Sequence, residues 1–241
     1  MARLPSWLLA RPIAHRGLHD DQRPENSLAA CDAAVAGDYP IELDVRLGKG
    51  GEIVVFHDDD LARMTGAPGN VDDTAWATLR SLRLGGTDEP IPTLADVLAR
   101  VRGRVPLVID MKAGRTTGKL ELAVHDALTD YRGDVALQSF HPIGLAKVRR
   151  LSRTRVLGLL ASDFVEEDLA RPLKFILRRL FLAPLSLPDY VGYDLRCLPF
   201  WATTAARKLG VGLLAWTVRT EDDLLRARSL ADNVIFENIR P

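Results

Sequence analysis

The chain has 241 residues, of which 47% are hydrophobic, and this is enough to build the core of one large domain. Lysine and arginine together number 32, and so do aspartate and glutamate, so there is no net field to attract nucleic acid or an anionic membrane from a distance. The charge balance therefore argues against nucleic acid as a partner.

The termini and the cysteines indicate an intracellular setting. Cys31 and Cys197 lack the spacing of a metal site, so we interpret them as reduced structural thiols. The apolar run at residues 7–10 is too short for the core of a signal peptide, and no segment reaches transmembrane length. We expect a cytoplasmic protein.

The first elements are a strand, a polar turn and a helix. A short strand at residues 13–14 ends in His15-Arg16-Gly17. The following helix is expected to be capped by Asn26 or Ser27 and to stop at Gly37. Residues 41–58 then read as two apolar strands joined by a glycine-rich tip at residues 48–51, which predicts a hairpin.

Two acidic residues interrupt the first arm of this hairpin. Glu42 and Asp44 share one face of a strand, with Cα atoms roughly 6.5 to 7 Å apart. A solvated strand face is the ordinary explanation, but the flanking Ile, Leu and Val residues predict burial. Because two buried like charges repel unless a cation or a shared proton relieves them, the pair predicts a metal site with oxygen ligands.

His57 follows the second arm of the hairpin. If residues 50–51 form the turn, His57 lies opposite Asp44; if the loop has four residues, it lies opposite Glu42. Either register places all three side chains on one face.

Residues 59–92 are irregular and rich in Gly, Pro, Asp and Thr, with one weak helical pattern at 74–82. We expect an insertion that acts as a lid and contributes to substrate choice. Helices and strands then alternate, beginning with a helix capped by Thr93. The predicted strands are 105–112, 135–140, 155–160, 190–194, 212–218 and 233–237, and the predicted helices between them are 118–131, 142–151, 166–184, 200–209 and 221–229.

These elements predict an α/β fold. If residues 53–56 are the returning arm of the hairpin, eight strand-then-helix units remain, which indicates a (β/α)8 TIM barrel spanning residues 1–241, with residues 59–92 as a small insertion after the His57-Asp58 hairpin. Counting that arm as a barrel strand leaves an open doubly wound sheet as an alternative. No GxGxxG or P-loop pattern supports it.

Barrel active sites lie at the carboxyl ends of the strands, and polar residues gather at those positions here. Each has an ordinary structural explanation when taken alone, but together they predict one site. They are His15, Arg16, Glu42, Asp44, Asp110, Lys112, Gln138, Ser139, Trp216 and Glu237.

The residue types suggest a reaction on a phosphodiester. Glu42, Asp44 and Asp110 offer the oxygen ligands that Mg²⁺ or Ca²⁺ prefers. Arg16 and Lys112, also at strand ends, are cationic donors that suit a phosphoryl group. They predict an anionic small-molecule substrate. A metal ion and cations would stabilise charge on the phosphate oxygens during cleavage.

Two histidines complete this set. His15 and His57, with ordinary pKa values of about 6.5, can serve as an acid and a base near neutral pH. Asp58 is placed to orient the network. Arg16 and Lys112 are the cationic donors, as a planar fork and a point charge.

Eight short motifs follow one another along the chain: HRG at 15–17, PENS at 24–27, ELDV at 42–45, VVFHD at 54–58, IPTL at 91–94, IDMK at 109–112, QSF at 138–140 and WTV at 216–218. In this order they resemble the glycerophosphodiester phosphodiesterase family across nearly the whole chain. The resemblance implies a barrel with a small insertion domain, a divalent metal, and hydrolysis of glycerophosphodiesters to an alcohol and glycerol phosphate. It assigns His15 and His57 to acid/base catalysis, Arg16 and Lys112 to phosphate binding, and Glu42, Asp44 and Asp110 to the metal. From its place at the strand ends, we also expect Trp216 to bind substrate.

The chain departs from this family at four places. Asp110 stands where Glu is usual, which shortens the ligand by one methylene, and Ser27 replaces Thr at a helix cap. Arg219 stands where Asn commonly follows WTV, and Glu237-Asn238 replaces a Thr-Asp pair. The last two changes bear on recognition of the alcohol, because an added Arg could favour a more anionic or larger headgroup.

Two other functions stay open. One is cleavage of lipid phosphodiesters, as by a lysophospholipase D or sphingomyelinase D, with weak membrane contact through Lys174–Leu182; an ordinary barrel helix with a basic edge is the plainer reading. The other is a catalytically silent binding protein on the same scaffold. The sequence does not determine the alcohol, the preferred metal or the oligomeric state. It also leaves open whether water attacks directly or a cyclic phosphate forms first, and which histidine is the acid and which the base.

Overall fold

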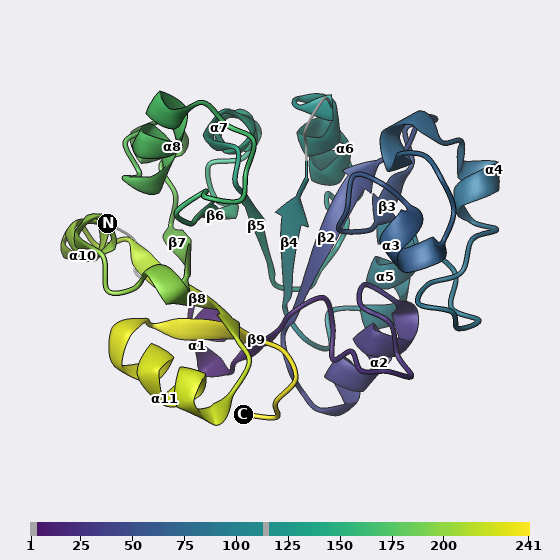
Figure 1. Ribbon diagram of the computed structural model, residues 1–241, viewed down its shortest axis with the longest axis horizontal. Helices are drawn as coiled ribbons and strands as arrows, with labels where there is room; N and C mark the ends of the chain where they lie inside the picture. Colours follow the sequence, from purple (N-terminus) through teal and green to yellow (C-terminus); the bar gives the residue numbers. More distant parts are fainter. Residues whose placement is uncertain (1–3, 113–115) are drawn as a thin grey trace. The chain divides into compact units, whose positions relative to one another are not determined.

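The computed structural model describes residues 4–112 and 116–241, and these fall into two compact units. One unit is residues 14–135, and the other is residues 136–241 together with the N-terminal residues up to 13. Each unit is built from parallel strands that alternate with helices (Figure 1).

In the unit of residues 14–135, β2 pairs in parallel with β1 and with β4, and β3 pairs antiparallel with β2. Figure 1 shows α3 and α4 beside the β2–β3 hairpin. The elements are β1 (Ile13–Ala14), α2 (Leu28–Ala36), β2 (Ile41–Leu47), β3 (Ile53–Val55), α3 (Ala62–Thr65), the 3-10 helix η1 (Val71–Asp73), α4 (Trp76–Leu79), α5 (Leu94–Val101), β4 (Leu107–Met111) and α6 (Lys119–Ala127).

In the other unit, β5 to β9 pair in parallel in chain order. Tyr190 and Tyr193 on β7 are its largest fully buried side chains. The elements are α1 (Ser6–Ala10), β5 (Val135–Ser139), α7 (Pro142–Leu151), β6 (Val156–Ala161), α8 (Arg171–Arg178), α9 (Ala183–Ser186), β7 (Tyr190–Asp194), the 3-10 helix η3 (Leu195–Cys197), α10 (Trp201–Lys208), β8 (Gly212–Val218), α11 (Glu221–Leu230) and β9 (Asn233–Phe236).

The strand order and the strand–helix alternation are those of a (β/α)8 barrel, so the predicted fold class is confirmed. Eight of the described strands run parallel, and β3 is the antiparallel return of the hairpin. The alternative of an open doubly wound sheet is therefore wrong.

Local sequence explains where the site-bearing elements begin and end. The Ser27 side chain accepts a hydrogen bond from the Ala30 N–H, and Gly37 ends α2 as expected. Thr93 and Asp96 form a reciprocal capping box at the start of α5. Six of the seven residues of β2 are buried, as in a strand covered on both faces.

The hairpin register differs from both predictions. Val45 pairs with Val55 and Leu47 with Ile53, so Asp44 lies opposite Phe56 rather than His57. The connection has five residues, 48–52, closed by a hydrogen bond of 2.8 Å from the Gly48 N–H to the Glu52 carbonyl. This length shifts the pairing by one residue from either expectation. Because β3 ends at Val55, the chain beyond the strand, and not strand alternation, directs His57.

The predicted helix at 166–184 is wrong in extent. It is replaced by α8 and α9, with Pro172 in the first turn of α8. Leu180 has a φ of +59°, a left-handed conformation that cannot continue an α-helix.

Segment 59–92 has a hydrophobic cluster of its own. Val54 and Phe56 at the end of the hairpin pack with Leu61 and Leu79 of the segment, and all four are almost fully buried. Since burying such a side chain stabilises a fold by about 1.5–3 kcal/mol, this contact anchors the segment to the hairpin. The other buried members are Val71, Leu84 and Ile91.

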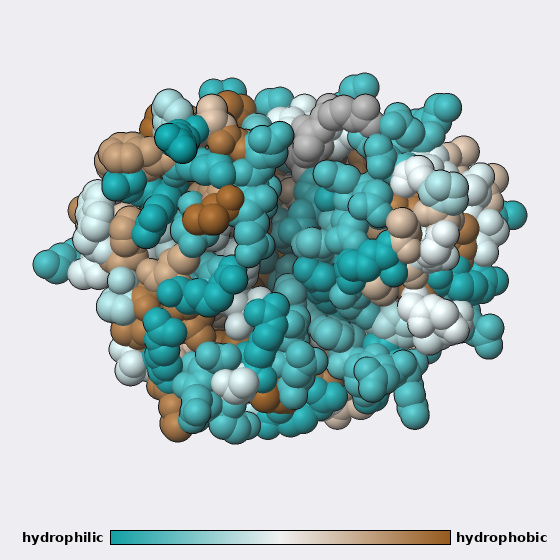
Figure 2. Space-filling view, in the orientation of Figure 1, coloured by the Kyte–Doolittle hydropathy of each residue, from teal (hydrophilic) through white to brown (hydrophobic). Residues whose placement is uncertain are grey.

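None of the helices in the described part of the chain is long and apolar enough to cross a membrane. Hydrophobic residues do gather on the surface of the unit of residues 136–241, over the region that holds α8 and α10 (Figure 2). Phe175 of α8 and Trp201 of α10 each expose about half of their surface, 51% and 56%.

Candidate active site

Three carboxylates meet on two neighbouring strands, β2 and β4. Asp44 on β2 is the register partner of Asp110 on β4, and Glu42 precedes Asp44 by two residues on the same face. All three are at most 2% exposed, and one oxygen atom from each lies within 4.8 Å of the others. The expected acidic triad is therefore assembled by strand pairing.

The carboxylates differ in their electrostatics. Burial, with Asp44 and Asp110 nearby, raises the pKa of Glu42 well above its usual value. Burial also raises the pKa of Asp110, against the opposing effect of Lys112. For Asp44 burial is outweighed by Lys112, His57 and Arg16, which hold its pKa below the usual range.

Lys112 lies between two of these carboxylates. Its Nζ is 2.6 Å from Asp110 Oδ2 and 3.1 Å from Asp44 Oδ1. Burial would lower the pKa of Lys112, but the two aspartates outweigh it and raise that pKa above its ordinary value. The ammonium group is therefore charged. It contacts one oxygen of each aspartate, so Asp44 Oδ2 and Asp110 Oδ1 can still bind another group.

The donor set fits a hard cation. Asp110 Oδ1 is a buried carboxylate oxygen that accepts no hydrogen bond within the described part of the chain. Such an oxygen is costly to bury without a partner, and a metal ion supplies one. Three carboxylates match the oxygen ligands of Mg²⁺ or Ca²⁺, so the triad can hold a metal ion.

Asn26 has a role that sequence analysis missed. Its Nδ2 donates to Asp44 Oδ2 at 2.9 Å, and its Oδ1 accepts from the Asp44 backbone N–H at 3.1 Å. The residue adopts a φ of +60°, a conformation that Asn tolerates better than most residues. Ser27 takes the cap, so Asn26 is free to orient a carboxylate of the triad. The only sequence signal was its place beside the cap in the PENS motif.

Arg16 contacts the triad through a backbone hydrogen bond and a side-chain ion pair. Its backbone N–H donates to Glu42 Oε2 at 3.0 Å, and its Nε lies 3.3 Å from Asp44 Oδ2. Its Nη1 donates to Glu25 Oε1 at 2.8 Å. Burial would lower the pKa of Arg16, but these carboxylates raise it, so the guanidinium is fixed and charged.

His57 is held by its backbone and by its ring. Arg46 donates to the His57 carbonyl at 2.9 and 2.7 Å, and the ring Nδ1 lies 2.6 Å from Asp58 Oδ1. Burial, helped by Lys112 and Arg16, lowers the pKa of His57 to about 4 despite Asp44 and Asp58. The imidazole is therefore neutral near pH 7.

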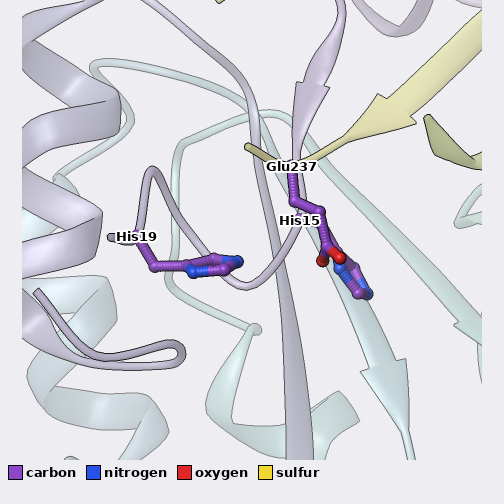
Figure 3. A group of neighbouring side chains, drawn as sticks. All are labelled: His15, His19 and Glu237. Carbon is purple, nitrogen blue, oxygen red and sulfur yellow. The ribbon is translucent and has the colours of Figure 1, made fainter. Parts of the chain in front are cut away.

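His15 comes directly after β1. Its Nε2 lies 4.0 Å from Glu42 Oε2, which places it beside the triad. His19, from the same loop, has a ring nitrogen within 4.8 Å of His15 (Figure 3) and was not expected from the sequence.

Trp216 lies on β8 in the other unit. Its ring packs edge-to-face against Phe140 at 5.6 Å between centroids, and its buried Nε1 makes no hydrogen bond within residues 4–112 and 116–241. Its role in substrate binding stays a prediction. Gln138 accepts a hydrogen bond of 2.9 Å from the buried Tyr190 hydroxyl, a contact within the core.

Two of the departures from the family pattern pair with each other. Arg219 Nε donates to Glu237 Oε1 at 2.6 Å. An arginine and a glutamate that replace uncharged positions thus offset each other's charge.

Comparisons with known proteins agree with this geometry. The model of the glycerophosphoryl diester phosphodiesterase family matches residues 15–239. A glycerophosphodiester phosphodiesterase of Caldanaerobacter subterraneus subsp. tengcongensis is 31% identical over 238 residues, which cover 94% of this chain and 93% of that protein. A lysophospholipase D of Rattus norvegicus is 35% identical over 117 residues, covering 43% of this chain and 37% of that protein.

A solved structure has the same fold. A phosphodiesterase of Oleispira antarctica, in complex with its product sn-glycerol-3-phosphate, superposes with a TM-score of 0.80 at 23% identity and covers 94% of this chain and 92% of its own. The family match extends over both units. The chain therefore belongs to the glycerophosphoryl diester phosphodiesterase family and is a phosphoric diester hydrolase.

Proposed function

We propose that this enzyme hydrolyses glycerophosphodiesters to an alcohol and glycerol phosphate with a divalent cation and a pair of histidines. The observation that carries the proposal is the buried triad of Glu42, Asp44 and Asp110 with His15 and His57 beside it. Buried carboxylates that repel each other are rarely kept unless they bind a cation.

The triad would hold the ion, Mg²⁺ or Ca²⁺. When bound, the ion supplies charge stabilisation to the phosphoryl oxygens. Arg16 and Lys112, both charged and mostly buried, add further positive charge at the same place. Both can therefore bind the phosphodiester as well as orient the carboxylates.

His57 is suited to act as the base. With Nδ1–H donating to Asp58 Oδ1, the neutral ring carries its lone pair on Nε2. That nitrogen can take the proton of the attacking hydroxyl group, whether from water or from the glycerol. His15 is then the candidate acid that protonates the leaving alkoxide.

The test is a panel of glycerophosphodiesters and lysophospholipids assayed with Mg²⁺, with Ca²⁺ and with EDTA. We expect hydrolysis of glycerophosphodiesters that EDTA abolishes and that one of the two ions restores. Full activity after exhaustive dialysis against EDTA would contradict the metal site. A clear preference for lysophospholipids would favour the lipid substrate class instead.

A lipid surface is a second candidate partner, favoured by the exposed face near α8. Residues 169–188 contain four basic residues and no acidic one: Arg171, Lys174, Arg178 and Arg179. Phe181 lies between Phe175 and Trp201, with ring centroids 6.1 and 6.4 Å away, and each ring is about half exposed. Exposed aromatics bordered by basic residues suit the interface of an anionic bilayer.

Vesicle flotation tests this contact. We expect binding to phosphatidylglycerol vesicles, weaker binding to phosphatidylcholine, and loss of binding in Phe181→Ser/Trp201→Ser. Leu225→Ser is the matched control, because Leu225 on α11 is 67% exposed in the same unit. Equal binding by both variants, or self-association of the wild type without vesicle binding, would contradict a lipid-binding face.

A further inference from the structure

We infer that Arg63, in the first helix of segment 59–92, is a positioning residue that aligns both the proposed base and the proposed phosphate-binding arginine. The inference rests on the proposed function and deepens it. A single guanidinium group connects two carboxylates, and each of these carboxylates fixes a different residue of the site. Segment 59–92 thereby takes part in assembling the site.

The first connection leads to His57. Arg63 Nε donates to Asp58 Oδ2 at 2.5 Å, and Asp58 Oδ1 lies 2.6 Å from His57 Nδ1. The two oxygens of Asp58 are thus divided between Arg63 and His57. Because Arg63 fixes the plane of this carboxylate, it also fixes the direction and the tautomer of the imidazole.

The second connection leads to Arg16. Arg63 Nη2 donates to Glu25 Oε1 at 2.6 Å, and Nη1 donates to Glu25 Oε2 at 3.2 Å. Glu25 Oε1 also accepts from Arg16 Nη1 at 2.8 Å. Glu25 is therefore held between two guanidinium groups. By fixing the Glu25 carboxylate, Arg63 also fixes the Arg16 guanidinium, whose Nε lies next to Asp44.

Only an arginine suits this place. Its planar fork presents donors in different directions, whereas a lysine has one compact charge that cannot satisfy two carboxylates in the same geometry. The electrostatics agree, because the hydrogen bonds to Glu25 and Asp58 raise the pKa of Arg63 above its ordinary value.

The exposure of Arg63 separates positioning from a purely structural role. Its side chain is 47% exposed, while Glu25 and Asp58 are 15% and 18% exposed. Ion pairs at that exposure contribute little to global stability. The α3 backbone is anchored independently, because Leu61 is buried in the hydrophobic cluster of the segment. Removing the Arg63 side chain should leave the fold intact and disturb the site.

The test compares Arg63→Ala and Arg63→Lys with Arg83→Ala as the matched control. Arg83 is an exposed arginine of the same segment that donates to the backbone carbonyls of residues 80–82. We expect Arg63→Ala to lower kcat and raise KM for a glycerophosphodiester, each by about ten- to a hundredfold, the usual cost of losing a supporting partner. Arg63→Lys should recover only part of this, and Arg83→Ala should match the wild type.

Two double mutants divide the effect. In an Asp58→Asn background Arg63→Ala should no longer lower kcat, and in a Glu25→Gln background it should no longer raise KM, because the connecting carboxylate is already lost. Additive effects in both backgrounds, or wild-type kinetics in Arg63→Ala, would overturn the inference.

A measurement without turnover keeps this test apart from that of the proposed function. ¹⁵N-histidine NMR reports the tautomer of His57, which should be a single Nδ1–H form in the wild type and in Arg83→Ala and a mixture in Arg63→Ala. Should no glycerophosphodiester be hydrolysed, the proposed function fails while this readout still decides the role of Arg63. An unchanged His57 tautomer in Arg63→Ala would overturn it.

Discussion

The two units each carry a buried aspartate at the end of a strand, yet these aspartates have different surroundings. Asp194 ends β7 and is 2% exposed; both of its oxygens accept hydrogen bonds from Arg196, at 2.7 to 3.2 Å. Asp110, near the end of β4, is equally buried, but its Oδ1 accepts no hydrogen bond within the described part of the chain and two other carboxylates lie beside it. A buried carboxylate therefore indicates function when its surroundings leave it unsatisfied.

The same contrast holds for histidines. In the unit of residues 136–241, His141 Nδ1 accepts from the Gly144 N–H at 3.1 Å and caps α7. In the unit of residues 14–135, His57 is bonded to Asp58 and its pKa is lowered to about 4, mainly by burial. One histidine completes a helix, and the other is held neutral beside a set of charges.

The largest expected effect comes from the histidines. His57→Ala should lower kcat by about two to four orders of magnitude, the usual contribution of general acid–base catalysis. His141→Ala should leave kcat unchanged and reduce the free energy of unfolding by about 1 kcal/mol, through the lost helix cap. Steady-state kinetics and chemical denaturation of both variants measure this, and equal kcat values would remove the distinction.

The leaving group then separates His15 from His57. A nitrophenyl phosphodiester needs little protonation of its leaving group, so loss of the acid His15 should harm it far less than a glycerol ester. Loss of the base His57 should harm both substrates alike. The same loss for both variants on both substrates would contradict the assignment of roles.

The aspartates give the next largest effect. Asp110→Asn should lower kcat by about two to three orders of magnitude, because charge stabilisation at the phosphate is lost. Asp194→Asn keeps the size of the side chain but replaces one of the two acceptor oxygens, so it should leave kcat unchanged while costing about 1 kcal/mol of stability. A loss of activity in Asp194→Asn without a loss of stability would show that Asp194, like Asp110, has a role in activity.

Metal removal and pH should change stability through Glu42. Its pKa is raised in the folded state, so the metal-free folded protein binds more protons than the unfolded chain above about pH 4.5, and stability should fall as pH rises through the region above that value. Glu42→Gln should weaken this dependence in EDTA, and the raised pKa of Asp110 should account for a remaining part. Saturating Mg²⁺ or Ca²⁺ should raise the Tm of the wild type at pH 7 and not that of Glu42→Gln, and an equal rise in both would contradict the triad as the metal site.

The smallest effect is expected at Arg219. Since Glu237 already pairs with this arginine, Arg219→Ala should shift the preference between anionic and neutral headgroups only slightly. Glu237→Gln, which releases the arginine, should shift it more, toward anionic headgroups. Competition assays with paired substrates measure both, and a large shift in Arg219→Ala alone would contradict the pairing as the restraint.

The sequence by itself determined the alternation of strands and helices, the fold class and the acidic triad. These depend on short-range patterns: apolar runs of strand length, residues two apart on one face, and polar residues at strand ends. The spacing of Glu42 and Asp44 was enough to place both carboxylates together, because side-chain alternation along a strand is geometric.

Only the tertiary structure decided the hairpin register, the role of Asn26 and the network of Arg63. A five-residue connection can close a hairpin in several ways, and packing of the apolar face chose between them. Arg63 lies 38 residues from Glu25 and five from Asp58, and no periodicity relates them. Their ion pairs form because segment 59–92 packs Leu61 against Val54 and Phe56. Burial of apolar surface between distant parts of the chain drives this packing, and it does not follow from the local sequence.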